Sequence, residues 1–134
     1  MGGGGTTGKI AKFTGATAIG NSTIVETGGN VGVGTATPNE QLEITGNFRL
    51  PATTATTGII KSGANRFIHN FGNSNFFAGV NAGNLTMTGI SNTATGVAAL
   101  QSNTTGGENT AIGVSALLSN TSGIQNTASG LGAL

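Results

Sequence analysis

The segment NTATGVAAL at residues 92–100 returns as NTAIGVSAL at 109–117 and as NTASGLGAL at 126–134, with 17 residues between successive starts. A weaker copy, NFFAGVNAG, begins 17 residues earlier, at Asn75. A 17-residue unit is too small to bury a core of its own, so we expect it to stack on its neighbours. The recurring positions are Asn92, Ala94, Gly96, Leu100, Asn109, Ala111, Gly113, Leu117, Asn126, Ala128, Gly130 and Leu134.

Each repeat is predicted to be extended, with side chains alternating between two faces. In the middle copy one face carries Ala111, Gly113, Ser115 and Leu117, and the other carries Thr110, Ile112, Val114 and Ala116. The first face is small, which permits close backbone approach, either against the opposite wall of a narrow solenoid or against partner chains around a three-fold axis. A helical interpretation competes, but the internal Gly and the flanking Thr and Asn lower helix propensity.

The linkers between copies contain turn chemistry. Residues 103–106 read Asn-Thr-Thr-Gly and residues 120–123 read Asn-Thr-Ser-Gly. Asn, Ser and Thr side chains bond to nearby backbone, and Gly accepts a positive φ. The repeat therefore predicts strand, turn, short strand and turn.

The composition is that of a fibrous protein. Ile, Val, Leu and Phe make up 30 of the 134 residues, 25 are Gly, and only 7% are charged. Few large side chains are available to offset the ordering of so many small polar residues, so we expect subunits to share a core. The low charge argues against disorder.

Several classes of protein are disfavoured by the residues. The formal net charge is +1, and the five cations are scattered without interleaved aromatic residues, which gives no nucleic-acid footprint. No apolar run is long enough for a membrane span, and no signal peptide is recognisable. The absence of Cys excludes disulfides.

Along the chain we expect a flexible leader over residues 1–8 and a short-strand module over 9–50, where short alternating runs are separated by turns. Its last two strands are expected at 41–45 and 47–50. Residues 51–74 are predicted to be a linker with a short strand at 58–61 and a Phe-rich cap, and 75–134 the repeat region, which is cut off at a unit boundary. The capping cluster is expected to contain Phe67, Phe71, Phe76 and Phe77, with binding-site aromatics as the alternative.

Two groups of residues resemble known families. The runs at 8–15, 19–22, 29–38 and 42–46 resemble the shaft modules of phage tail-fibre proteins and of bacterial surface proteins with tail-fibre domains. The Asn-Thr-Ala-x-Gly-x-x-Ala-Leu repeats are similar to the head repeats of trimeric autotransporter adhesins, whose heads are trimers of left-handed parallel β-rolls. The resemblance implies an extracellular protein, on a virion tail fibre or a bacterial cell surface.

Catalytic and metal-binding patterns are weak. Gly3 to Lys9 matches part of a phosphate-binding loop, but Ile10 stands where Ser or Thr should hold magnesium, so chance is favoured. There is no Asp, and Glu40 and Glu43 would point to opposite faces of a strand. A lone His69 near several Phe is more often packed than a metal ligand on a three-fold axis. We therefore expect neither catalysis nor a cofactor.

These observations predict an all-β, elongated homotrimeric fibre, with a short-stranded, β-prism-like N-terminal part followed by a parallel β-roll or β-solenoid of 17-residue repeats. Its expected role is structural or adhesive, its partner is itself, and a cell-surface glycan or receptor would bind through regions outside this fragment. The alternative is an ice- or crystal-surface binder that uses the Thr93, Thr110 and Thr127 ladder. Such binders need two regular rows of Thr, and the next outward position of each repeat is occupied by Thr95, Ile112 and Ser129, so the second row is not regular.

Overall fold

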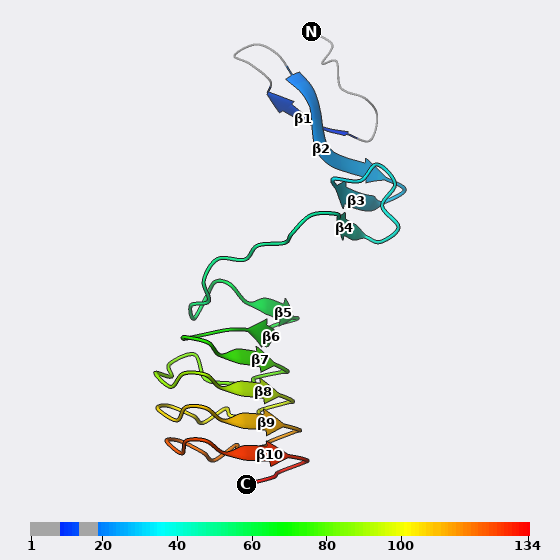
Figure 1. The fold of residues 1–134 in the computed structure, drawn as a ribbon. Coiled ribbons are helices and arrows are strands. Elements are labelled where there is room, and N and C mark those ends of the chain that lie inside the picture. The colour runs from blue at the N-terminus through cyan, green and yellow to red at the C-terminus, as the bar shows by residue number, and fades with distance from the viewer. Residues whose placement is uncertain (1–8, 14–18) are drawn as a thin grey trace. The chain divides into compact units, whose positions relative to one another are not determined.

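A computed structural model describes residues 9–13 and 19–134 of the chain. All the regular elements in these residues are β-strands (Figure 1). The chain divides into two compact units, residues 1–49 and 50–134. The all-β fold class predicted from the sequence is confirmed.

The N-terminal unit is a four-stranded sheet. Its strands are β1 (Lys9–Phe13), β2 (Ile19–Thr27), β3 (Asn30–Val33) and β4 (Leu42–Ile44), in the order β1-β2-β3-β4. The first two pairings are antiparallel, and β3 pairs with β4 in parallel. Gly28 and Gly29 connect β2 to β3 with φ angles of 60° and 84°, which suits the two-residue hairpin turn that needs positive φ at both positions.

The strand expected at residues 47–50 is not formed. Nothing in the described part of the chain pairs with this segment, and Phe48 is 65% exposed. An apolar residue every second position is not enough for a strand when no neighbouring strand accepts the backbone hydrogen bonds. The expectation is corrected to an irregular segment after β4.

The second unit is one six-stranded sheet, part of which is a β-solenoid. Its strands are β5 (Ile60–Ser62), β6 (Asn65–His69), β7 (Phe76–Ala78), β8 (Thr93–Thr95), β9 (Thr110–Ile112) and β10 (Thr127–Ser129). The pairings β5 with β6 and β6 with β7 are antiparallel, whereas β7 to β10 are parallel (Figure 1). Each parallel pair is offset by 17 residues, so Ala94 lies opposite Ala111 and Ala111 opposite Ala128. The predicted solenoid of stacked 17-residue repeats is confirmed. Each described rung contains a single three-residue strand, so the second, short strand expected in each repeat is not formed, and irregular turns take its place.

Hydrogen bonds between rungs continue beyond the strands. In the turn after each strand, the Ala98 amide donates to the Val80 carbonyl at 2.9 Å, the Ser115 amide to the Val97 carbonyl at 2.8 Å, and the Gly132 amide to the Val114 carbonyl at 2.9 Å. On the return side the Thr104 amide donates to the Thr121 carbonyl at 2.8 Å. Turns as well as strands therefore stack, and rungs spaced by about 4.8 Å satisfy one another's backbone.

The expected alternation of faces is only partly correct. It holds over β9, where Thr110 is half-buried, Ala111 is buried and Ile112 is exposed. After Gly113 the chain turns through Ser115 and Leu117, whose φ angles are 58° and 51°. This left-handed backbone breaks the two-residue period. Consequently the neighbours Ala116 and Leu117 are both buried, although they were assigned to opposite faces.

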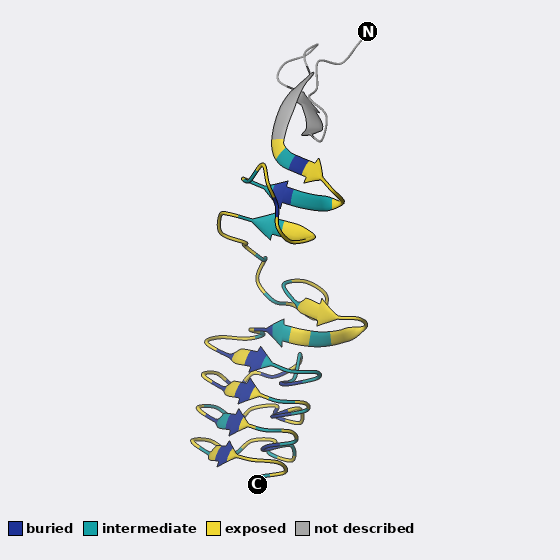
Figure 2. Cartoon of the chain, turned by 90° about the vertical axis from the view of Figure 1, so that its right-hand side faces the viewer, coloured by how far each residue is buried: buried dark blue, intermediate teal, exposed yellow. Residues whose placement is uncertain are grey.

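The interior of the solenoid is enclosed by one chain. Ten residues form its buried hydrophobic cluster: Phe77, Ala82, Met87, Ala94, Ala99, Leu100, Ala111, Ala116, Leu117 and Ala128. Figure 2 shows the buried positions repeating from rung to rung. Of the two alternatives left open for the small face, the narrow solenoid wall is the one found. The expectation that partner chains cover Ala94, Ala111 and their equivalents is therefore wrong.

Glycine is required where strands leave the sheet. Gly96 and Gly113 have φ angles of 135° and 127°. A Cβ added to Gly113 would lie 2.7 Å from the carbonyl carbon of Gly130 in the next rung, closer than real Cβ atoms come. The repeated Gly therefore permits rungs to stack at a sheet-like spacing.

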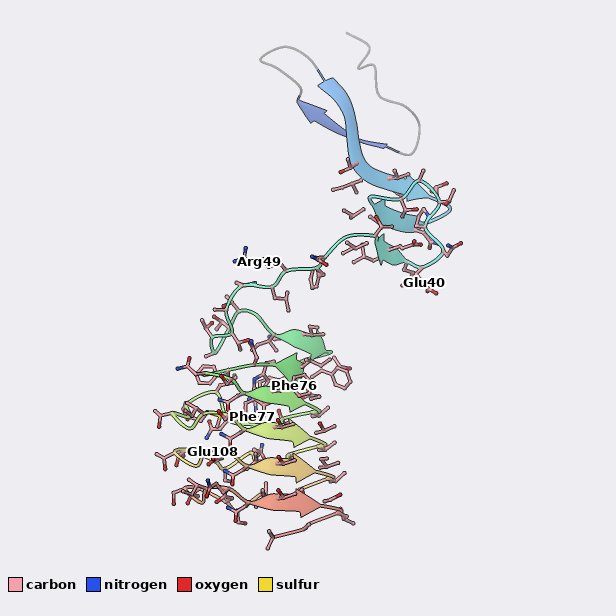
Figure 3. The ribbon with its side chains drawn as sticks, viewed as in Figure 1. Glu40, Arg49, Phe76, Phe77 and Glu108 are labelled. Carbon is pink, nitrogen blue, oxygen red and sulfur yellow. The ribbon has the colours of Figure 1, made fainter. Side chains whose placement is uncertain are left out.

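The predicted Phe cap is reduced to two residues. Phe77 is fully buried and Phe71 packs against the core cluster, but Phe67 and Phe76 are 44% and 48% exposed. Phe76 and Phe77 are neighbours in β7, so their side chains lie on opposite faces of the strand (Figure 3). The short strand expected at 58–61 is present as β5, shifted by one or two residues, and the Phe-rich segment contributes β6, which was not expected. Both extend the sheet by antiparallel pairing.

Candidate functional site

The positions that repeat in every rung produce three features: a buried ladder of Asn side chains, an exposed stripe of apolar side chains, and an exposed rank of Thr. We treat the solenoid surface defined by these features as the candidate functional site. It is a candidate for binding and assembly.

The Asn ladder runs through Asn75, Asn92, Asn109 and Asn126. The Asn92 side-chain oxygen accepts from the Asn109 backbone amide at 3.1 Å and from the Asn109 Nδ2 at 3.0 Å. Asn109 does the same for Asn126, at 3.0 and 3.1 Å. Asn92 and Asn109 are fully buried. Each rung thus fixes the position of the next through two bonds to a single oxygen, in addition to the backbone ladder.

Each ladder residue also ties its rung to the return segment. The Nδ2 of Asn92 donates to the Gly106 carbonyl at 2.9 Å, and the Nδ2 of Asn109 donates to the Gly123 carbonyl at 2.8 Å. Buried polar groups that are fully bonded in this way specify one arrangement of the surrounding chain. The sequence marks these Asn as repeated residues, but their side-chain ladder was not foreseen. Its signal is an Asn at the same place in every copy, directly before a buried strand.

A second Asn closes the return turn, as the turn chemistry predicts. Asn103 accepts from the Gly106 amide at 2.9 Å and donates to the Gly106 carbonyl at 2.9 Å. Asn120 makes the equivalent pair with Gly123, at 2.8 and 3.1 Å. These bonds occupy both polar atoms of each side chain. Residues 103–105 and 120–122 also match the Asn-x-Ser/Thr pattern of glycosylation acceptors, and the turn accounts for Asn at both positions.

The exposed stripe lies in the turn that follows each strand. Val97 is 46% exposed, Val114 45% and Leu131 82%, and these residues are 17 positions apart. Ile112, at the end of β9, is 49% exposed. Because Val97, Val114 and Leu131 belong to rungs that are hydrogen-bonded to one another, they form one apolar line along the stack. We call these four residues the apolar stripe.

The Thr rank lies on the outer face of the parallel strands. Thr93, Thr110 and Thr127 are direct partners in β8, β9 and β10. Thr93 and Thr127 are exposed, and Thr110 is half-buried. The parallel rank, Thr95, Ile112 and Ser129, is in register but chemically mixed. Both ranks stand where the sequence places them.

His69 is packed at the junction between β6 and the first rung. It is 4% exposed, its ring centroid lies 4.9 Å from that of Phe77, and its Nε2 lies 2.9 Å from the Ala82 carbonyl oxygen. The carbonyl can only accept, so Nε2 carries the proton, and Nδ1 accepts from the Phe71 amide at 3.3 Å. Burial lowers the pKa of His69, and the nearby Arg66 cation adds to this effect against the opposing Ala82 bond. The ring is held neutral.

Arg66 completes this junction. One of its terminal nitrogens, Nη2, donates to the Gly83 carbonyl at 3.1 Å, while its buried Nε has no hydrogen-bond partner among the described residues. Next to His69, a cavity of about 270 Å³ is lined mainly by Leu50, Pro51, Ile60, Ile68 and Phe76. The lining offers few polar groups to orient a ligand.

Within their own units, the carboxylates bond to nearby groups or are exposed. Glu43 accepts from the Asn39 amide at 2.8 Å, Glu40 is exposed, and Glu108 accepts from Gln125 at 3.0 Å (Figure 3). Among the described residues, no group of three His, Cys, Asp or Glu could hold a metal ion. The segment resembling part of a phosphate-binding loop lies mostly in residues 1–8, outside the described residues, as does the expected leader.

No helix in the described part of the chain is long and apolar enough to cross a membrane. No protein-family model matches the chain, and neither a curated protein nor a solved structure matches it. The geometry of the solenoid therefore carries the functional argument.

Proposed function

We propose that this chain is a structural and adhesive segment of a homotrimeric extracellular fibre, carried by a phage tail or a bacterial surface, and that it acts as a rigid projecting element without catalysis. The observation that carries the proposal is the in-register stack of β7 to β10. Both strands and turns are bonded to the next rung, and a buried Asn ladder runs through the stack. Such a stack resists bending and shear because every displacement breaks several hydrogen bonds at once.

Homotrimer formation is supported by the distribution of apolar side chains in each unit. In the solenoid, Val97, Ile112 and Val114 are exposed on the single chain, although the interior buries Ala together with Phe77, Met87, Leu100 and Leu117. In the N-terminal unit, Leu42 and Phe48 are 60% and 65% exposed. Exposed apolar positions of this kind are typical of surfaces that are covered on assembly. A β-prism-like arrangement of three N-terminal units would cover such positions.

Static light scattering tests the proposal. We expect a mass three times the 13.0 kDa of one chain at micromolar concentration. A stable mass of 13.0 kDa over the accessible concentration range would refute the homotrimer.

A second candidate function, binding to ice or a crystal surface, is favoured by the in-register Thr93, Thr110 and Thr127 rank. The mixed rank beside it, which contains Ile112, weakens the match to a regular lattice. The test is thermal hysteresis of the purified chain, with Thr110→Tyr as the disrupting variant and Ser119→Tyr, on an exposed turn of the same rung, as the control. Absence of hysteresis in the unmodified chain would eliminate this function.

A further inference from the structure

The solenoid places its branched aliphatic side chains in an unusual way. In the rung that contains β9, Ile112 and Val114 are 49% and 45% exposed, whereas the buried interior positions include Ala111 and Ala116. In a chain that remains a monomer, burial of the larger side chains would stabilise the fold more, because the free energy gained grows with the apolar surface removed from water. The exposed aliphatic residues are therefore unlike the scattered apolar residues of an ordinary surface.

These exposed residues are also ordered along the stack. The apolar stripe contributes one side chain per rung at Val97, Val114 and Leu131, and Ile112 precedes Val114 by two residues in the chain. The backbone bonds from the Ser115 amide to the Val97 carbonyl, at 2.8 Å, and from the Gly132 amide to the Val114 carbonyl, at 2.9 Å, hold these turns at the rung spacing. A partner that covers the whole stripe must present apolar groups at the same spacing.

We propose that the apolar stripe is the contact surface between copies of this chain, which lie parallel with their rungs aligned. A second copy has the required spacing because it has the same 17-residue rung. Electrostatic repulsion does not oppose this contact, since the stripe is uncharged and the formal net charge of the chain is only +1. The inference rests on the proposed homotrimer and adds to it the surface that forms the interface. This surface replaces the small Ala and Gly face expected from the sequence.

The first test places a charge on the stripe. Val114→Asp is compared with Ser119→Asp, which adds the same charge to an exposed turn of the same rung. Light scattering over a concentration series should show association weakened at least tenfold in Val114→Asp and unchanged in Ser119→Asp. Assembly would bury the unpaired carboxylate of Val114→Asp, and the cost of removing that charge from water produces such a change. Far-ultraviolet circular dichroism checks that both variants retain the fold.

The second test does not depend on destabilising the interface. The natural chain has no Cys, so a single introduced thiol reports only its own neighbours. Val97→Cys should form disulfide-linked pairs under mild oxidation, because aligned stripes bring equivalent residues together. Ser102→Cys, on an exposed turn of the same rung, should not.

The outcomes separate the two proposals. If the unmodified chain is a monomer, the homotrimer and the interface both fail. If the unmodified chain is a trimer but Val114→Asp assembles equally well, or Ser102→Cys cross-links while Val97→Cys does not, the homotrimer stands and the stripe is wrong. Loss of assembly in Val114→Asp with cross-linking at Val97→Cys supports both.

Discussion

In the N-terminal unit, Val25 is the one buried hydrophobic residue among the side chains described, whereas ten hydrophobic residues form a continuous buried cluster in the solenoid. Both units are built from Gly, Thr, Asn and small aliphatic residues. In the N-terminal sheet, β2 and β3 are joined by a two-residue turn, β3 and β4 pair in parallel, and no 17-residue repeat stacks equivalent residues. The solenoid superimposes equivalent residues every 17 positions, so even Ala builds a core when it is stacked on Ala.

The largest expected difference between the units concerns glycine. Gly113→Val adds a side chain that would collide with the Gly130 backbone at a φ of 127°, and we expect the solenoid to lose about 4 kcal/mol or more. Gly46→Val in the N-terminal unit has no atom within 4 Å of the new Cβ and should change stability by less than about 1 kcal/mol. Thermal unfolding measures both. Equal melting temperatures would refute the assigned stacking of Gly113 on Gly130.

Substitution of buried Asn residues should give the second largest difference in stability between the units. Asn109→Ala removes the acceptor for the Asn126 amide and the donor to the Gly123 carbonyl, so we expect a loss of about 3 kcal/mol in unfolding free energy. Asn30→Ala in the N-terminal unit removes a single bond to the Pro38 carbonyl and should cost about 1 kcal/mol. Urea denaturation provides both values. If Asn109→Ala costs no more than Asn30→Ala, the ladder does not contribute as described.

Hydrophobic truncation should also distinguish the units. Leu100 is fully buried in the solenoid cluster, so Leu100→Ala should cost about 2.5 kcal/mol. Val25→Ala should cost about 1.5 kcal/mol, since fewer methyl groups are removed from a less enclosed site. The denaturation midpoints of the two variants test this order. A larger loss for Val25→Ala would mean that the N-terminal sheet has a better packed core than its burial indicates.

The smallest expected effect is that the stability of the second unit depends on pH near neutrality. His69, the only His in the chain, lies in this unit. Burial places the pKa of folded His69 below its usual value of 6.5, so the unfolded chain binds more protons between those two values. The stabilising contribution of neutral His69 is complete above pH 6.5 and falls as the pH drops toward the folded pKa. The loss is at most about 1.4 kcal/mol per pH unit.

Melting temperatures at pH 7 and pH 5 test this dependence. His69→Asn removes the titrating ring and should make the solenoid transition less sensitive to pH. Suppose that lowering the pH from 7 to 5 raises the melting temperature of the unmodified chain and does not raise that of His69→Asn. This result would contradict the neutral tautomer bonded to Ala82 and Phe71.

Part of the candidate site was predictable from the repeat alone. The Thr93, Thr110 and Thr127 rank follows from the 17-residue period and a strand that starts at each Thr, and the structure has that register. The apolar stripe does not follow from the repeat. Strand alternation places Val114 on the face opposite Ala111 and Gly113, and it does not predict a line of exposed apolar residues in the turns. The exposure of Val114 depends on the direction of the turn after Gly113, where Ser115 has a φ of 58°. Strand periodicity contains no information about such a turn.

By itself, the sequence determined the all-β class, the 17-residue rung, the strands at each Thr-Ala pair, the Asn turns and the requirement for Gly, because these depend on local backbone preferences and on exact repetition. Only the tertiary structure decided which side chains of the turn after each strand are inside. A single chain closes each rung through left-handed residues such as Leu117, which places Ala116 and Leu117 together in the interior and leaves Val114 outside. Closure is a property of the whole rung in three dimensions, and the short-range pattern of apolar residues does not specify it.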